Sequence, residues 1–254
     1  MTILAVRDVA RRFGGLAALG GVTLDVRAGE IRGLIGPNGS GKSTFFNVVS
    51  GILRPDAGTI LFDGTPIQDL AADRRQHLGL GRTFQEIQLF YDMTVLENVM
   101  VGAHRTGRAD IGAALLRPPW QRAEERRLRE AARECLDFVG LGALQDERAR
   151  TIAYGHQRLL EIARALAAGP RLLLLDEPAA GMNPAETRAL MGQVERIVAR
   201  GVTVFLVEHN MKMVMGLCER ITVLHHGQVI AEGTPAAVQA APAVLEAYLG
   251  RAGA

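Results

Sequence analysis

One nine-residue stretch constrains the fold of this chain more than any other. Residues 36–44 read Gly-Pro-Asn-Gly-Ser-Gly-Lys-Ser-Thr and match the pattern G-x-x-x-x-G-K-[ST]. Ile31–Ile35, which is apolar apart from Arg32, precedes the stretch, and residues 43–50 have the character of a helix. Glycines allow such a loop to point successive N–H groups at phosphate oxygens, and the following helix adds its positive N-terminal end. The stretch predicts a phosphate-binding loop in an α/β core.

Two side chains of the loop have a chemistry suited to a nucleotide. Lys42 supplies a mobile positive charge for the outer phosphates, and the Ser43 hydroxyl can reach a magnesium ion. Lysine is rare here, because only Lys42 and Lys212 are lysines among 29 basic residues. A lysine at this position of an arginine-rich chain indicates a task that suits a point charge better than a planar guanidinium.

A second group of candidate residues follows a run of four leucines. Leu172–Leu175 predicts a fully buried strand, and Asp176 and Glu177 come directly after it. A strand that ends in two carboxylates can place Asp176 near a magnesium ion, while Glu177 polarises an attacking water. Together with the phosphate loop, this pair predicts nucleotide hydrolysis.

Length and composition favour a globular α/β protein. The chain has 254 residues, of which 48% are hydrophobic, and its net charge of +2 gives no indication of nucleic-acid binding. It has no N-terminal signal-type stretch and no run of 18 apolar residues, so we expect a chain that is neither exported nor membrane-spanning. Cys135 and Cys218 lack metal-ligand spacing and are expected to be reduced core residues.

Hydrophobic periodicity and turn residues predict strands in both halves of the chain and helices in the middle. The expected strands are residues 3–9, 22–27, 31–35, 59–62, 80–84, 172–175, 202–207, 221–225 and 228–231. The expected helices are residues 43–50, 70–77, 94–103, 121–139, 155–168, 210–217 and 242–249, with others starting at Asn183 and Thr234. Asp69 is expected to cap the second helix, and Thr94 with Glu97 forms a capping box.

The middle of the chain differs from its two ends. Strand signals are missing from Gln85 to about Gly155, and residues 104–120 form an irregular segment. The mixed-charge run that follows is most simply a solvated helix face. We therefore expect a helical subdomain inserted between two halves of an α/β core.

The order of these motifs resembles the nucleotide-binding subunits of ATP-binding cassette (ABC) transporters. In sequence order the matching features are Phe13, residues 36–44, Gln85, Gly155-x-Gln157, Asp176-Glu177-Pro178 and His209. The resemblance implies one ABC ATPase domain over residues 1–254, with a P-loop NTPase (RecA-like) core and an N-terminal antiparallel β subdomain. It places the core at 1–85 and 156–236, the inserted α-helical subdomain at about 86–155, and a short helical tail at 237–254.

The resemblance also implies a role for each site residue. Glu177, His209, Gln85 and Lys42 would be catalytic, with His209 at the γ-phosphate, and Ser43, Gln85 and Asp176 would bind Mg²⁺. ATP would be bound by Phe13, which stacks on adenine, and by Gly36, Pro37, Asn38, Gly39, Ser40, Gly41, Lys42, Ser43 and Thr44. Two such subunits would enclose two ATP molecules, and Ala153, Tyr154, Gly155, His156 and Gln157 would cap the ATP bound by the partner.

The sequence departs from the family pattern at two places. Ala153–Gln157 stands where the family usually has Leu-Ser-Gly-Gly-Gln, so Tyr154 replaces a serine and His156 replaces a glycine. Asn183 stands where the family usually has an aspartate. We expect these changes either to alter the rate of ATP hydrolysis or to mark the chain as one half of a heterodimer.

Further stretches resemble the ATPase subunits of branched-chain amino acid importers. They are residues 11–16, 81–85, 89–90, 92–98, 179–184, 232–235 and 246–250, together with the variant at 153–157. ATPases of urea, amide and lipopolysaccharide transporters share much of this pattern, and a soluble non-transport ABC ATPase is the less favoured alternative.

The importer reading implies several partners. They are membrane permease subunits, a second ABC ATPase and, indirectly, a solute-binding protein, with the chain attached peripherally to the cytoplasmic face of the membrane. Leu89, Phe90 and Tyr91 are expected either to be exposed and dock on the permease, or to pack within the helical subdomain.

Overall fold

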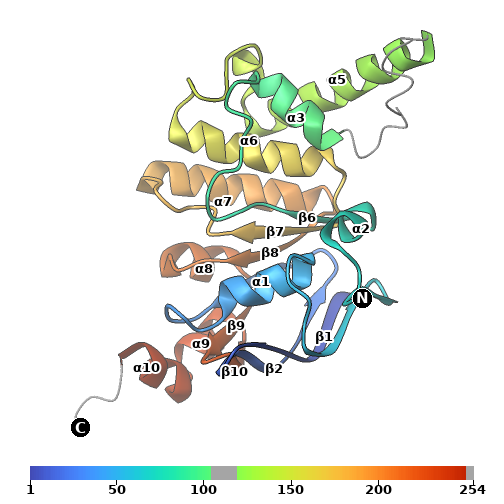
Figure 1. Ribbon diagram of the computed structural model, residues 1–254. Helices are drawn as coiled ribbons and strands as arrows, with labels where there is room; N and C mark the ends of the chain where they lie inside the picture. The colour runs from blue at the N-terminus through green and yellow to red at the C-terminus, as the bar shows by residue number, and fades with distance from the viewer. Residues whose placement is uncertain (104–118, 250–254) are drawn as a thin grey trace. The chain divides into compact units, whose positions relative to one another are not determined.

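The computed structural model describes residues 1–103 and 119–249, which form two compact units (Figure 1). Met1–Arg82 and Arg171–Ala254 belong to the first unit, and Thr83–Pro170 belongs to the second. The irregular segment expected at 104–120 lies almost wholly outside the described residues. The division into core, inserted subdomain and tail stays a prediction. Within the described ranges, every helix is too short or too polar to cross a lipid bilayer.

A four-stranded antiparallel sheet begins the first unit. Its order is β2-β1-β4-β5, with β1 at Thr2–Phe13, β2 at Leu16–Arg27, β4 at Ala57–Phe62 and β5 at Thr65–Pro66. The first two strands are longer than expected, because they pair along their whole length from Thr2 opposite Arg27 to Phe13 opposite Leu16. Several register shifts interrupt this pairing, and each shift breaks the alternation that marks a strand in the sequence.

The second sheet of this unit is mainly parallel. Its order is β10-β9-β3-β8-β7-β6, and only β10 runs antiparallel to its neighbour. The strands are β3 at Ile31–Ile35, β6 at Leu80–Arg82, β7 at Leu172–Asp176, β8 at Thr203–Val207, β9 at Arg220–His225 and β10 at Gln228–Gly233. Every residue of β3, β7 and β8 is buried, which explains why these strands are mostly apolar. The buried Arg32 of β3 is the exception, and it pairs with Thr222 and Glu232.

Helices pack against these sheets. They are α1 at Lys42–Ser50, α2 at Ala72–His77, α7 at Pro184–Ala199, α8 at Met211–Leu217, α9 at Pro235–Gln239 and α10 at Pro242–Leu249. Side chains of α1 share one apolar core with residues from both sheets. The rings of Phe45 and Phe46 meet Phe205 of β8 edge-on, with centroids 6.1 and 5.2 Å apart. This packing fixes α1, and with it the loop at its N-terminus, against β8.

The second unit is built from helices. They are α3 at Val95–Ala103, α5 at Pro119–Val139, α6 at Tyr154–Ala167 and a short 3-10 helix at Gly142–Leu144. The capping box predicted for α3 is confirmed, because Thr94 Oγ1 accepts from the Glu97 N–H and Glu97 Oε2 accepts from the Thr94 N–H. Along α5, Leu128, Ala132 and Leu136 are buried while the charged residues near them are exposed, as expected for a solvated helix face.

The predicted cap at Asp69 is wrong. Helix α2 begins at Ala72, and Ala71 occupies the cap position with an extended backbone and no side-chain hydrogen bond. The Asp69 carboxylate instead pairs with Arg54 on the surface. An acidic residue near a helix start can pair with a basic side chain instead of capping the helix. Which of the two it does depends on a tertiary contact that the local sequence does not reveal.

A buried ion pair joins the two strands at one edge of the parallel sheet. Arg82, the last residue of β6, donates to Asp176 Oδ2 at 2.9 Å and to Ser50 Oγ at 2.6 Å. Both charged side chains are almost fully buried, and burial lowers the pKa of the Arg82 guanidinium while Asp176 opposes that effect. Removing one member would leave the other charge in a poorly solvated site.

We therefore expect Arg82→Met to lower the free energy of unfolding by about 3–5 kcal/mol. Arg54→Met, which breaks the exposed pair with Asp69, is the matched control and should cost less than about 1 kcal/mol. Urea denaturation of the three proteins measures both values. Equal losses in the two variants would contradict the burial argument.

Asn183 forms the predicted cap of α7. Its side chain accepts from the N–H groups of Ala185 and Glu186, while Glu186 Oε2 accepts from the Asn183 N–H at 2.9 Å. We expect Asn183→Ala to lower the free energy of unfolding by about 1 kcal/mol, and Asn183→Asp to preserve it, because both polar side chains cap well. Urea denaturation tests this, and an Asn183→Asp variant as unstable as Asn183→Ala would refute it.

Candidate active site

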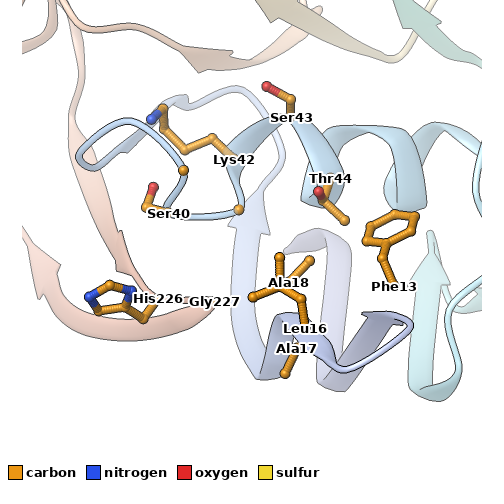
Figure 2. Close-up of a pocket in the computed structure, with 12 residues that line it drawn as sticks. Phe13, Leu16, Ala17, Ala18, Ser40, Lys42, Ser43, Thr44, His226 and Gly227 are labelled. Atoms are coloured by element: carbon orange, nitrogen blue, oxygen red, sulfur yellow. The ribbon is translucent and has the colours of Figure 1, made fainter.

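A pocket of about 400 Å³ in the first unit contains the start of the phosphate loop's helix (Figure 2). It is lined by Phe13, Leu16, Ala17, Ala18, Gly39, Ser40, Gly41, Lys42, Ser43, Thr44, His226 and Gly227. The polar part comes from the loop and the first turn of α1, and the apolar part comes from the β1–β2 hairpin. Phe13 is 45% exposed, so its ring is available for stacking. One apolar wall beside an array of N–H groups suits a nucleotide with its base and its phosphates.

Two glycines of the loop are required by their surroundings. A Cβ atom on Gly36 would lie 2.1 Å from the Leu224 carbonyl oxygen, and one on Gly41 would lie 2.5 Å from that of Ala18. Gly41 has a φ of +103° and occupies the cap position of α1, where no side chain makes a capping hydrogen bond. The N-terminal N–H groups of α1 therefore face the pocket without a side-chain cap between them and an anion.

Lys42 lies among oxygen atoms. Its ammonium group donates to the backbone oxygens of Gly36 at 2.8 Å and Pro37 at 2.9 Å. Burial lowers the pKa of Lys42, while the nearby Glu177 and Asp176 carboxylates act in the opposite direction. The lysine thus lies within electrostatic range of Asp176 and Glu177, the two carboxylates predicted from the sequence to be functional.

The parallel register explains why these groups are close together. Val207 of β8 lies opposite Asp176 of β7 on one side and opposite Leu34 of β3 on the other. The carboxyl ends of the three strands consequently lie in one row, and the residues that follow them share one edge of the sheet. The phosphate loop follows β3, Asp176 is the last residue of β7 with Glu177 directly after it, and His209 lies two residues after the end of β8.

Glu177 and His209 face each other across this edge. His209 Nδ1 lies 3.5 Å from Glu177 Oε2, and His209 is largely exposed whereas Glu177 is mostly buried. Glu177 has a φ of +47°, which is unusual for a residue with a side chain. Its N–H donates to the Val207 backbone oxygen at 2.9 Å. The backbone at Glu177 is therefore held in a costly conformation by its neighbours, as is common at functional sites.

Gln85 lies in the second unit, where the N-terminal half of α6 anchors its segment. Arg158 donates to the backbone oxygens of Phe84 and Gln85, and the Phe84 N–H donates to Glu161 Oε1 at 3.0 Å. Arg158 and Glu161 form a buried pair at 3.3 Å, and burial raises the pKa of Glu161. The backbone of Gln85 is thus tied to the helix that begins at Tyr154.

The segment Ala153–Gln157 forms the start of α6. Ala153 is the cap residue and makes no side-chain capping hydrogen bond, so the first N–H groups of the helix have no side-chain cap. Gln157 Nε2 donates to the backbone oxygens of Ala149 and Ile152 at 3.1 and 3.2 Å, which fixes the approach to the helix. The segment has the form of an anion-binding helix terminus.

Tyr154 takes part in this arrangement although it departs from the family pattern. Arg158 Nη2 donates to its hydroxyl at 3.2 Å, and the guanidinium carbon lies 5.7 Å from its ring centroid. The ring remains 46% exposed. Tyr154 is therefore positioned by the same arginine that contacts Gln85.

The alternative in which Leu89 is exposed for docking is wrong. Leu89 is only 8% exposed, whereas Phe90 and Tyr91 are 47% and 45% exposed. The buried Asn98 fixes this segment: its Oδ1 accepts from the Phe90 N–H, and its Nδ2 donates to the Phe90 backbone oxygen, both at 2.9 Å. With the backbone fixed in this way, Leu89 is buried while its two successors remain accessible.

Four contributions to the site were not indicated by the sequence. The hairpin residues 16–18 and the turn His226-Gly227 line the pocket, and Glu208 lies buried beside His209. Tyr248 of α10 lies close to the Gly36 backbone: partial burial raises the pKa of its phenol, and the nearby backbone opposes that rise. No local pattern predicts that these residues lie at the site, because only the folded chain brings them to the loop.

The structure gathers Phe13, the phosphate loop, Asp176, Glu177 and His209 in the first unit, and Gln85 with Ala153–Gln157 in the second.

Two family profiles match this sequence. The profile described as ABC transporter matches residues 19–180, and that described as branched-chain amino acid ATP-binding cassette transporter matches residues 228–254.

Several curated proteins are similar over nearly their whole length. The high-affinity branched-chain amino acid transport ATP-binding protein BraF of Pseudomonas aeruginosa is 43% identical over 251 residues, with 98% of each chain covered. The corresponding protein LivG of Escherichia coli K12 is 41% identical over 252 residues, again with 98% of each chain covered.

Solved structures agree in fold. An ATP-binding cassette of an ABC transporter in its ADP conformation superposes with a TM-score of 0.86 at 35% identity, covering 99% of this chain and all of that one. A dimeric cassette in a post-hydrolysis state with ADP and Pi gives a TM-score of 0.77 at 26% identity, covering 91% and 98%. The phosphate loop after β3, the carboxylate pair at the end of β7 and these full-length similarities lead to one conclusion: the chain belongs to the ABC transporter family, as an ATP-binding cassette ATPase.

Proposed function

We propose that this chain is the ATP-hydrolysing subunit of an importer for branched-chain amino acids. The observation that carries the proposal is the single sheet edge that presents the phosphate loop, Asp176 and the Glu177–His209 pair together. The amino acid specificity rests on the relatives, which are named as branched-chain amino acid transport ATP-binding proteins, and on the matching C-terminal profile.

Each candidate site residue of the first unit has a defined task in this proposal. Phe13 stacks on adenine, the loop N–H groups and Lys42 bind the phosphates, and Glu177 polarises the attacking water. His209 contacts the γ-phosphate and lies close enough to Glu177 to keep both groups at the reacting centre. Lys42 leaves the loop carbonyls and moves to the phosphates when these arrive.

The oxygen donors suit Mg²⁺, because this ion prefers hard oxygen ligands. The Ser43 hydroxyl, the Asp176 carboxylate and the Gln85 amide oxygen would hold the ion. When bound, the ion would neutralise charge on the β- and γ-phosphates. The ion pair with Arg82 orients Asp176 by occupying its Oδ2 atom.

The proposed assembly contains a second ABC ATPase and membrane permease subunits at the cytoplasmic face of the membrane, with a solute-binding protein as an indirect partner. Dimeric cassettes among the structural relatives support pairing. In such a pair, Ala153–Gln157 of one subunit caps the ATP bound by the other. ATP stabilises the closed pair relative to the open one, and this difference in affinity drives the cycle.

Glu177→Gln is expected to bind ATP normally and to lose at least about a hundredfold in kcat, because the amide cannot act as a general base. Glu195→Gln, an exposed glutamate on α7, is the matched control and should retain full activity. Phosphate release and equilibrium binding of a fluorescent ATP analogue measure the two quantities. Near-normal turnover by Glu177→Gln would overturn its assignment.

Phe90 is expected to contact the permease, because it remains exposed on a segment fixed by Asn98 and joined through the chain to Gln85. In proteoliposomes containing the assembled importer, Phe90→Ala should reduce transport several-fold and weaken the stimulation of ATPase activity by solute. Ile52→Ala, an equally exposed side chain of the first unit, should change neither. Unchanged coupling in Phe90→Ala would show that Phe90 is not a docking residue.

A further inference from the structure

Glu208 is a buried carboxylate at the centre of the sheet edge that carries the catalytic groups. It follows Val207, the last residue of β8, and precedes His209. Only 1% of its surface is exposed. A glutamate is rarely buried to this extent unless its oxygens have strong partners, so its contacts call for an explanation.

The contacts of Glu208 are backbone amides from two separate segments. Its Oε1 accepts from the Ala179 N–H at 2.8 Å. Its Oε2 accepts from the N–H groups of His209 and Asn210 at 3.0 and 3.1 Å. One carboxylate therefore joins the segment that follows β7 to the segment that follows β8.

These two segments carry the groups that act on the terminal phosphate. Ala179 lies two residues after Glu177, whose backbone has the strained φ of +47°, and His209 directly follows Glu208. Hydrogen bonds to an ionised acceptor are stronger than neutral ones, so this bridge resists relative movement of the two segments. The 3.5 Å separation of Glu177 and His209 is the distance that such movement would change first.

We propose that Glu208 is a positioning residue for ATP hydrolysis, which sets the placement of Glu177 relative to His209 through the backbone amides of Ala179, His209 and Asn210. The inference rests on the proposed function, because positioning matters only if Glu177 and His209 act together on ATP. Glu208 is 1% exposed and its carboxylate accepts from these backbone amides, so it acts through them and not on the nucleotide itself.

The carboxylate form is essential to this role. In Glu208→Gln one oxygen is replaced by an NH₂ group, which donates hydrogen bonds and cannot accept them. Whichever way the amide turns, one of the two segments loses its acceptor and faces a donor instead. Glu208→Asp keeps the charge but shortens the side chain by one methylene, so it reaches one segment less well.

The test compares Glu208→Gln and Glu208→Asp with Glu30→Gln. Glu30 is also a buried carboxylate that accepts a backbone hydrogen bond, from the Arg27 N–H at 2.7 Å, but it precedes β3 and so lies at the opposite end of that strand from the phosphate loop. For each protein, urea denaturation, equilibrium binding of an ATP analogue, kcat and KM are measured. Glu30→Gln thus reports what the loss of a buried turn contact does by itself.

For Glu208→Gln we expect kcat to fall between about tenfold and a hundredfold, as for a small misplacement of catalytic groups, with ATP affinity and KM within about twofold of the wild type. Glu208→Asp should give a smaller fall in kcat. Glu30→Gln should keep its kcat even if its stability falls as much. If Glu208→Gln fails to fold, Glu208→Asp provides the same comparison.

Two outcomes would overturn the inference while leaving the proposed function intact. The first is an active wild type whose kcat is unchanged in folded Glu208→Gln or in Glu208→Asp. The second is a loss of activity that follows stability equally in the Glu208 and Glu30 variants, which would make Glu208 an ordinary structural residue. A wild type without ATPase activity would contradict the proposed function itself, and the inference with it.

Discussion

The parallel register of β3, β8 and β7 is the constraint on which the candidate site depends. Hydrogen bonds across Leu34, Val207 and Asp176 bring the carboxyl ends of three strands into one row, although the strands are far apart in the sequence. Groups from three separate segments therefore meet at one edge without long side chains or flexible loops. The close-packed apolar core beneath this edge keeps it rigid. In that core Phe205 packs against Phe45 and Phe46.

Placing charged groups at the rim of a buried sheet has a cost, and the structure offsets it with specific partners. Arg82 pairs with Asp176, and backbone amides solvate the Glu208 carboxylate. The positive φ of Glu177 adds local strain that the surrounding hydrogen bonds must maintain. These partners confine the carboxylates to fixed positions, so that little reorganisation is needed when negative charge develops on the transferred phosphate.

The residues assigned to the proposed site are divided between the two units. The first contains the loop, the carboxylates and His209, and the second contains Gln85 and the uncapped start of α6 at Ala153. Within the second unit, Arg158 contacts both the Gln85 backbone and Tyr154, so a change at one place is felt at the other. This connection gives Tyr154 a structural reason to be present where the family usually has a serine.

The sequence by itself determined the order of elements and the reacting groups. The loop at 36–44, the four leucines before Asp176 and the capping residues Thr94 and Asn183 each carry a local signature, because backbone geometry and helix ends demand particular residue types nearby. The tertiary structure decided what depends on contacts between distant segments. It gave Asp69 a surface partner in place of a helix end, and it buried Leu89 while leaving Phe90 exposed. It also brought Glu208 between two catalytic segments and Tyr248 to the phosphate loop. Such placements follow from strand register and side-chain packing, which no stretch of sequence specifies alone.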